Sequence, residues 1–284
     1  MMFETDIRPL DLTLTLDCGQ AFRWKELEQG FWTGVVGKHM LTLRQSSGSV
    51  AINACTDDQN VVRLVRGYLR ADDDIARIQR ALAKDQTLTR GMKRYRGLRI
   101  VKMDEWECLV SYTLATYANI PRIKKMIDRL CTDYGEPIRG GEHAFPTIRR
   151  LGEASEKDLE KCGLGYRAKY VAGLCESLTP NELKSMTRLE YPDLKDRLLE
   201  LHGVGEKVSD CVSLFGFGKL EAFPIDVWIV RALGRLYHVK GSYRKLSEFA
   251  FERFGEYAGY AQEYLYFNER SAAHENACAF SEVR

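Results

Sequence analysis

The chain has 284 residues, of which 45% are hydrophobic and 29% charged, a composition typical of globular proteins with a sizeable core. Its formal net charge of +2 gives only weak support to nucleic-acid binding, because dedicated binders are often far more basic. The sequence contains no apolar run of the roughly 18 residues that a membrane span needs and no signal-peptide pattern, so we expect an intracellular monomer with no membrane partner.

The first 53 residues predict β structure. Leucines alternate with polar residues at positions 10, 12, 14 and 16, which is the period of a half-buried strand. The pattern continues through residues 22–24, 31–36 and 40–43, with turn residues between them. We therefore expect an antiparallel sheet.

The apolar period changes to that of helices after Asp57. Residues 61–69 and 75–82 each suit one helix, and the chain becomes wholly helical after about residue 100. The predicted fold class is mainly α with an N-terminal α+β part. Residues 1–100 are expected to form an α+β domain with the antiparallel sheet, and residues 101–284 an all-helical domain of two subdomains.

Capping residues place several helix ends in the second part. Asp104 and Ser155 are expected N-caps, Pro121 suits a first helical turn, and Gly135 suits a helix end. Further helices are expected over residues 166–178 and 246–268. The small, polar tail 271–284 is expected to be loosely held.

Basic side chains gather at residues 93–102, which include Arg99, and again at 149–150 and 167–169. Runs of this kind either lie on a solvated face or contact phosphate. We give the two interpretations equal weight.

A helix–hairpin–helix pattern is centred on LHGVGEK, residues 201–207. Apolar residues repeat at helical intervals on both sides, and Gly203 and Gly205 allow the backbone between them to turn sharply. The turn leaves backbone N–H groups free at the start of the second helix, which creates a phosphate site. The usual ligand of such a hairpin is a nucleic-acid backbone.

Lys207 follows this hairpin, and Asp226 precedes the apolar run of a later helix. Taken singly, the lysine is most simply a solvated cation, and the aspartate an N-cap worth about 1 kcal/mol. Together they can also do chemistry, because an amine can attack a sugar carbon while a carboxylate stabilises positive charge on the sugar ring.

The sequences LHGVGEKVSDC and FPIDVW resemble the signature of the helix–hairpin–helix, Gly/Pro-Asp superfamily of base-excision DNA glycosylases, in the bifunctional branch that carries a lysine. CGQAFRW, GLGYRAKY and GEYAGYAQEYLYF match the 8-oxoguanine DNA glycosylase family in order, so the resemblance spans residues 18–266. It implies a helix–hairpin–helix glycosylase fold, with Lys207 forming a Schiff base with the sugar and Asp226 stabilising the positive charge.

The resemblance also implies residues that recognise the lesion. The main-chain carbonyl of Gly19 would accept the extra N7 hydrogen of 8-oxoguanine, Gln262 would contact the Watson–Crick edge, and Cys211 and Tyr266 would stack on either side of the base. Without the resemblance, we would interpret Gly19 as part of a tight turn and Gln262 as solvent-facing. We would likewise interpret Cys211 as a buried helix residue and Tyr266 as a core aromatic.

Other residues are implied at the opposite strand, where they would fill the gap left by the flipped base, wedge the stack and hydrogen-bond to an orphan cytosine. These residues are Asn119, Arg122, Tyr166 and Arg167. The sequence departs from the family at Tyr117, where an asparagine normally enters the gap, so either Asn119 substitutes or the tyrosine stacks there. We expect a preference for cytosine opposite the lesion, and a tyrosine at position 117 can weaken that preference.

Contacts to the DNA backbone are implied for Gly203, Val204, Gly205 and Trp228. Trp228 is a second departure, because the family commonly has a histidine there. By the same resemblance the main-chain carbonyls of Leu199, Leu201 and Val204 hold a structural ion. No cofactor is expected to be required, and no iron–sulfur cluster, because only Cys278 follows Asp226 where cluster-bearing relatives have four cysteines.

The predicted function is base-excision repair. The enzyme would flip out and excise 8-oxoguanine and related oxidised purines from duplex DNA, then cut the abasic strand by β-elimination. Two alternatives stay open: a helix–hairpin–helix glycosylase for another damaged base, and a non-catalytic DNA-binding module. Gly19 and Gln262 favour the first function, and the joint presence of Lys207 and Asp226 argues against the module.

Overall fold

The computed structural model describes residues 1–46 and 48–281, with side chains described as far as residue 272. An antiparallel sheet of five strands precedes a mostly helical remainder, which confirms the predicted fold class. The sheet order is β1-β5-β4-β3-β2. Its strands are β1 (Met2–Asp6), β2 (Trp24–Glu28), β3 (Phe31–Val36), β4 (His39–Ser46) and β5 (Ser49–Ala54).

The alternating leucines do not form a strand, and that prediction was wrong. Three of them, at positions 12, 14 and 16, lie in the short helix α1 (Leu12–Leu16), which Asp11 caps by accepting the N–H of Leu14 at 2.8 Å. Residues 12, 15 and 16 are buried, which is the spacing of one helical face. Over so few residues the strand and helix periods overlap, and the cap at Asp11 selects the helix.

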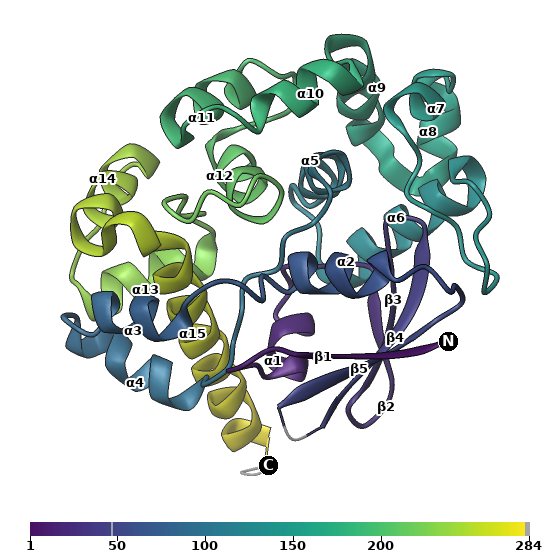
Figure 1. The fold of residues 1–284 in the computed structure, drawn as a ribbon. Coiled ribbons are helices and arrows are strands. Elements are labelled where there is room, and N and C mark those ends of the chain that lie inside the picture. The colour runs from purple at the N-terminus through teal and green to yellow at the C-terminus, as the bar shows by residue number, and fades with distance from the viewer. Residues whose placement is uncertain (47, 282–284) are drawn as a thin grey trace.

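The helices surround the central helix α5 (Glu105–Leu114), in which every residue from 106 to 114 is buried. Figure 1 shows α2 beside the sheet, α7 to α11 as an arc above α5, and α3, α4 and α13 to α15 gathered at the lower left. The bounds of the other helices are α2 (Asn60–Tyr68), α3 (Ile75–Leu82), α4 (Gln86–Arg94), α6 (Ile120–Tyr134), α7 (Ile148–Gly152), α8 (Glu156–Leu159), α9 (Ala168–Ser177), α10 (Pro180–Met186), α11 (Tyr191–Leu199), α12 (Glu206–Phe215), α13 (Val227–Leu236), α14 (Tyr243–Phe254) and α15 (Ala258–Ser281).

The predicted helix caps are confirmed. The Asp104 side chain accepts the N–H groups of Trp106 and Glu107 at 3.0 Å, and Ser155 caps α8. Pro121 lies in the first turn of α6, and Gly135 is the residue at which that helix ends.

The single helix predicted over residues 246–268 is two helices. Gly255 adopts a φ of +59°, and a short 3-10 turn over Gly255–Tyr257 separates α14 from α15. The backbone of α15 continues to Ser281, so residues 271–281 are helical, and the expectation that this tail is loosely held stays a prediction. Residues 282–284 and the Cys278 side chain lie outside the described part of the chain.

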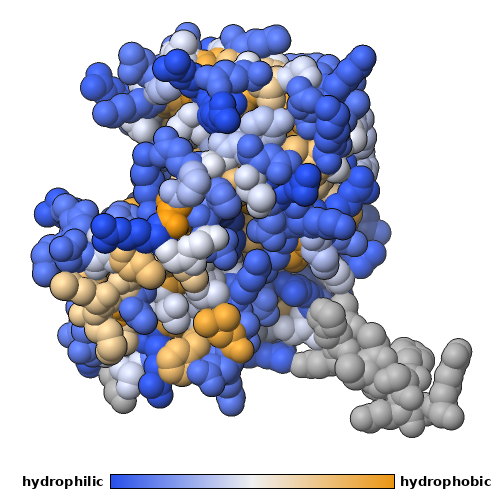
Figure 2. Space-filling view, turned by 90° about the vertical axis from the view of Figure 1, so that its right-hand side faces the viewer, coloured by the Kyte–Doolittle hydropathy of each residue, from blue (hydrophilic) through white to orange (hydrophobic). Residues whose placement is uncertain are grey.

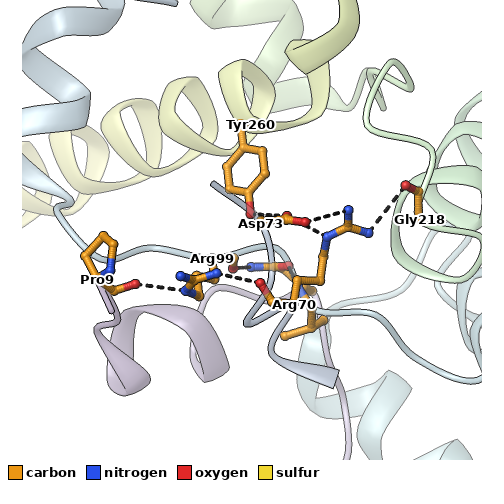
Figure 3. A network of polar contacts seen from close by, with 8 residues as sticks. Pro9, Arg70, Asp73, Arg99, Gly218 and Tyr260 are labelled. Atoms are coloured by element: carbon orange, nitrogen blue, oxygen red, sulfur yellow. Dashed lines mark hydrogen bonds and ion pairs between the residues drawn. The ribbon is translucent and has the colours of Figure 1, made fainter. Parts of the chain in front are cut away.

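Arg99 is fully buried, so it is not one of the solvated or phosphate-binding cations expected in its cluster. Its guanidinium donates to the carbonyls of Pro9 at 2.8 Å and Arg70 at 2.5 Å (Figure 3). Burial lowers the pKa of Arg99 below its ordinary value. This side chain joins the N-terminal segment to the turn after α2.

Arg70 extends the same network towards the helical part. Its guanidinium donates to both carboxylate oxygens of Asp73, at 2.7 and 3.0 Å, and to the Gly218 carbonyl at 3.3 Å. The Tyr260 hydroxyl on α15 donates to Asp73 at 2.7 Å (Figure 3). Because these groups come from distant segments, the network fixes α15 against the N-terminal part.

Single large hydrophobic side chains are exposed at several positions of the described chain, among them Leu27, Tyr117 and Phe251. Figure 2 views the side at the right of Figure 1, which is mostly hydrophilic. Across the chain, Tyr117 stands out because 94% of it is exposed. Within the described residues, no helix has the length and apolar character to traverse a bilayer.

Candidate active site

The hairpin joins α11 to α12 as predicted. Gly203 has a φ of +86°, and a Cβ there would overlap the Tyr170 ring, so this position requires glycine for both its conformation and its packing. Gly205 is the N-cap of α12 and carries no side chain above the first turn of that helix. The first N–H groups of α12 therefore point outward without a side-chain cap, which suits an anion.

Lys207 lies in the first turn of α12 and is half-buried. Its Nζ lies 5.2 Å from the centroid of the Tyr112 ring, which stacks on Phe215 and whose hydroxyl donates to the Gln20 carbonyl at 3.0 Å. Burial raises the pKa of the Cys211 thiol to about 12, and the neighbouring Lys207 opposes that shift. The amine of Lys207 thus lies near the Tyr112 ring and the buried thiol of Cys211.

Asp226 is the N-cap of α13. One carboxylate oxygen, Oδ1, accepts the N–H groups of Trp228 and Ile229 at 2.9 Å each. Burial raises the pKa of Asp226, while these two bonds and the charge of Lys207 act in the opposite direction. The cap interpretation and the chemical one are therefore compatible, because the carboxylate caps a helix and also interacts electrostatically with Lys207.

A buried network behind α12 fixes the two residues relative to one another. Asp210, which is fully buried, accepts hydrogen bonds from the hydroxyls of Tyr191 and Tyr243 at 2.6 Å and pairs with Lys195 at 2.9 Å. The Tyr243 hydroxyl also accepts the N–H of Ile225 at 3.2 Å, in the residue before Asp226. A carboxylate on the helix of Lys207 is thus tied to the loop that carries Asp226.

The residues predicted to recognise a base converge on the same region. Gly19 has a φ of +88°, and a Cβ there would lie 3.2 Å from Ile120 and 3.6 Å from the Tyr266 hydroxyl. Gln262 is buried rather than solvent-facing, and its Oε1 has no hydrogen-bond partner among the described residues. The Gly19 loop and the part of α15 that carries Gln262 and Tyr266 therefore lie side by side. Whether Cys211 and Tyr266 stack on a base stays a prediction.

A second group of predicted residues surrounds the turn after α5. Tyr117 has a φ of +51°, which is unusual for a residue with a side chain. Arg167 is buried, and its guanidinium donates to the carbonyls of Thr116 and Tyr117, the latter at 3.1 Å. It lies 4.4 Å from the ring of Tyr166, whose hydroxyl donates to Thr116 at 3.3 Å. Arg167 thus holds the turn that presents Tyr117, and its donors face that turn in this structure.

Asn119 and Arg122 are exposed at the start of α6. The Asn119 side chain is the N-cap of that helix and accepts the N–H of Arg122 at 3.0 Å. Its oxygen is therefore occupied by the cap, whereas the Arg122 side chain belongs to an exposed residue.

Trp228 is half-buried beside the N-terminus of α13. The guanidinium of Arg231, one turn later, lies 5.2 Å from the centroid of its ring. The indole therefore packs beneath a cation, which supplies the charge that a tryptophan lacks.

Sequence reasoning missed several residues of this region. Tyr112 and Tyr243 were not singled out, because neither residue stands in a motif. Glu263 had a usable signal, because a glutamate between Gln262 and Tyr266 interrupts the buried face of α15.

Comparison with known proteins identifies the relatives of the chain. Residues 2–109 match the 8-oxoguanine DNA glycosylase N-terminal domain, and residues 111–256 match the HhH-GPD superfamily of base excision DNA repair proteins. The sequence is 32% identical over 296 residues to the N-glycosylase/DNA lyase OGG1 of Arabidopsis thaliana, covering 96% of this chain and 81% of that protein.

Solved structures show the same fold. The apo-form of the 8-oxoguanine glycosylase/lyase of Clostridium acetobutylicum has a TM-score of 0.87 and 30% identity, covering 94% of this chain and 98% of that one. Its complex with double-stranded DNA containing cytosine opposite 8-oxoguanine has a TM-score of 0.88 and 29% identity, covering 96% and 98%.

Proposed function

Because the chain belongs to the HhH-GPD superfamily of base excision DNA repair proteins, in its 8-oxoguanine DNA glycosylase family, we propose that Lys207 and Asp226 carry out its reaction. The protein is a DNA N-glycosylase with DNA-(apurinic or apyrimidinic site) lyase activity, and its partner is DNA. It therefore acts in a DNA-containing compartment. The observation that carries the proposal is the half-buried amine of Lys207 placed within electrostatic reach of the Asp226 carboxylate.

The chemistry begins with an everted nucleotide, since a base inside a duplex is out of reach. Lys207 Nζ attacks C1′ of the sugar, the bond from C1′ to the base breaks, and the electron pair leaves with the base, which takes up a proton. Positive charge that develops on the sugar is stabilised by Asp226. One proton then passes from the attached amine to O4′ as the C1′–O4′ bond breaks, and a protonated C1′=N imine, the Schiff base, forms.

Strand cutting follows from the imine. The imine acidifies C2′, a proton leaves that carbon, and the C3′–O bond breaks, which cuts the strand on the 3′ side of the lesion by β-elimination. Water then hydrolyses the imine and frees Lys207.

Selection of 8-oxoguanine is assigned to the Gly19 loop and α15. The Gly19 carbonyl would accept the N7 hydrogen that guanine lacks. The unpaired Oε1 of Gln262 supports its proposed contact with the Watson–Crick edge, because a buried acceptor without a partner costs about 1–3 kcal/mol until a ligand supplies a donor. Cys211 and Tyr266 would enclose the base from its two faces.

Of the two candidates for the gap in the duplex, we favour Tyr117. The oxygen of Asn119 is used as a helix cap, whereas Tyr117 is almost fully exposed and is held by Arg167 in a backbone conformation that costs about 1–2 kcal/mol. A ring stacks on any base, so Tyr117 would accept several orphan bases. Arg122, which is exposed, would supply the preference for cytosine, and the buried Arg167 would contribute to it by holding the turn at Tyr117.

Backbone contacts are assigned to Gly203, Val204 and Gly205, which precede α12, where the first N–H groups of the helix have no side-chain cap. The carbonyls of Leu199, Leu201 and Val204 could hold an ion that adds positive charge there. The Leu201 carbonyl accepts the N–H of Val204 at 3.1 Å, which leaves one lone pair for such an ion. Near the lesion, Trp228 would position the Arg231 guanidinium against a phosphate. The enzyme would act as a monomer and without an iron–sulfur cluster.

A lesion panel tests the proposal. Duplexes that each carry one damaged base, paired in turn with each of the four bases, are incubated with the protein, and base release and strand cleavage are measured. The expected result is fastest release of 8-oxoguanine opposite cytosine. Faster release of an alkylated base or an oxidised pyrimidine would assign another lesion, and binding with no cleavage of any duplex would leave a DNA-binding module.

A further inference from the structure

Glu263 is a buried acid for which the proposed chemistry has no use. Only 3% of it is exposed, and its Oε2 has no hydrogen-bond partner among the described residues. A buried polar atom without a partner destabilises the fold, and an apolar side chain at this place would avoid that cost. The residue therefore suits a protein that gains a partner for it when a ligand binds.

Glu263 lies on the face of α15 that packs against the Gly19 loop. Residues three, four and seven apart on a helix share a face, and Glu263 precedes Tyr266 by three and Arg270 by seven. The Arg270 guanidinium donates to the Cys18 carbonyl at 3.5 Å, so this face meets the loop that contains Gly19. Glu263 lies on the same side.

The groups that face Glu263 from other elements are acidic or neutral. Burial, and after it the charge of Asp226 at the start of α13, raises the pKa of the Glu263 carboxyl to about 8. In turn Glu263 acts to raise the pKa values of Cys18 from the N-terminal segment, Tyr112 on α5 and Tyr266 on α15. A neutral acid is therefore the form that fits this site at neutral pH, because a second negative charge would repel Asp226.

We propose that Glu263 is a second base-contacting residue, whose protonated carboxyl hydrogen-bonds to the amino- and carbonyl-bearing edge of an everted guanine-type base beside Gln262. This rests on the proposed glycosylase function. A neutral carboxyl can both donate and accept a hydrogen bond, as that edge requires. Gln262 and Glu263 are consecutive buried residues that each leave one oxygen unpaired, so one ligand edge can satisfy both.

Two variants and two substrates test the proposal. Glu263→Met removes the polar atoms at similar length, and Glu263→Gln keeps a neutral hydrogen-bonding group. Single-turnover release of 8-oxoguanine is compared with cleavage at a preformed abasic site, which has no base to contact. Glu269→Gln is the control, because it changes a carboxylate on the same helix that pairs with Arg235.

The expected result is that Glu263→Met slows base release about tenfold, the effect of one lost hydrogen bond, and leaves abasic-site cleavage within about twofold of the native rate. Glu263→Gln should release the base at a near-native rate at pH 6.5. It should also lack the decline that ionisation of Glu263 causes in the native enzyme above pH 8.

Two results would overturn the proposal. One is native base release by Glu263→Met, and the other is an equal loss of both activities, which would mean that Glu263 only positions Asp226. If the native protein acts on neither substrate, the proposed function itself is refuted and this inference with it. Circular dichroism and thermal unfolding of each variant show whether a lost activity reflects a lost fold.

Discussion

Replacing Asp226 by asparagine should separate its two roles. In the structure a single oxygen of Asp226 accepts both N–H bonds of the cap, each at 2.9 Å, and an asparagine offers the same oxygen. We therefore expect Asp226→Asn to keep the cap of α13. Asp226→Ala removes both bonds and should cost about 1 kcal/mol of unfolding free energy.

The charge of Asp226 gives no support to stability at neutral pH. Its folded pKa is raised, so the stability contributed by the protonated form is present below the unfolded pKa and is lost as the pH rises through the folded pKa. Asp226→Asn removes that penalty at pH 7. The unfolding free energy of this variant should therefore equal or slightly exceed that of the native protein.

Activity should respond in the opposite way. Loss of one electrostatic contact to the charge of a transition state typically costs about 2.7–4 kcal/mol, or 10²–10³-fold in rate. We expect Asp226→Asn to slow single-turnover release of 8-oxoguanine by that factor, while urea unfolding shows native stability. A native rate for the asparagine variant, or a loss of stability as large as that of Asp226→Ala, would refute the assignment.

Three further outcomes follow from particular residues. Tyr117→Asn should raise the unfolding free energy measured in urea by about 0.5–1 kcal/mol, because asparagine tolerates a positive φ and little buried surface is lost. In an opposite-base panel the same variant should show a stronger preference for cytosine. Glu263→Gln should be more stable than the native protein by roughly 4–5 kcal/mol at pH 8.5 and nearly equal at pH 4.5, because raising a pKa from 4.5 to about 8 corresponds to about 1.4 kcal/mol for each pH unit. The stability of the neutral acid is complete below about pH 4.5 and is lost as the pH rises through about 8. A parallel pH dependence of thermal unfolding in the two proteins would contradict this prediction. Arg99→Met should lower the unfolding free energy by about 2–4 kcal/mol, since it removes the hydrogen bonds that the buried guanidinium donates to the carbonyls of Pro9 and Arg70. A native urea midpoint would show that the network is dispensable.

The sequence predicted the fold where local chemistry decides it. Asp104, Ser155 and the glycines of the hairpin act on their own neighbours, so their helix ends and turn could be placed from a few residues. The alternating leucines failed because five residues are too few to separate a strand from a helix. The break at Gly255 was missed because the apolar period continues across it. The domain boundary near residue 100 stays a prediction.

In the candidate site, too, some residues could be predicted from local motifs and others could not. Lys207, Asp226 and Gly19 stand in recognisable motifs, and the structure brings Lys207 together with Asp226 and Gly19 together with Tyr266. Arg99 and Arg167 look like surface cations in the sequence, yet tertiary packing buries both against backbone carbonyls. No local pattern reports such burial, because the carbonyls come from distant segments.

The central claim is that the amine of Lys207 forms the covalent bond to the sugar. The most direct measurement is borohydride reduction of the protein during its reaction with an 8-oxoguanine duplex, followed by digestion and mass spectrometry of the cross-linked peptide. The account predicts one adduct, located on Lys207, and a Lys207→Gln variant that still binds the damaged duplex but yields neither adduct nor free base. An adduct on another lysine, or a trapped complex formed by Lys207→Gln, would contradict it.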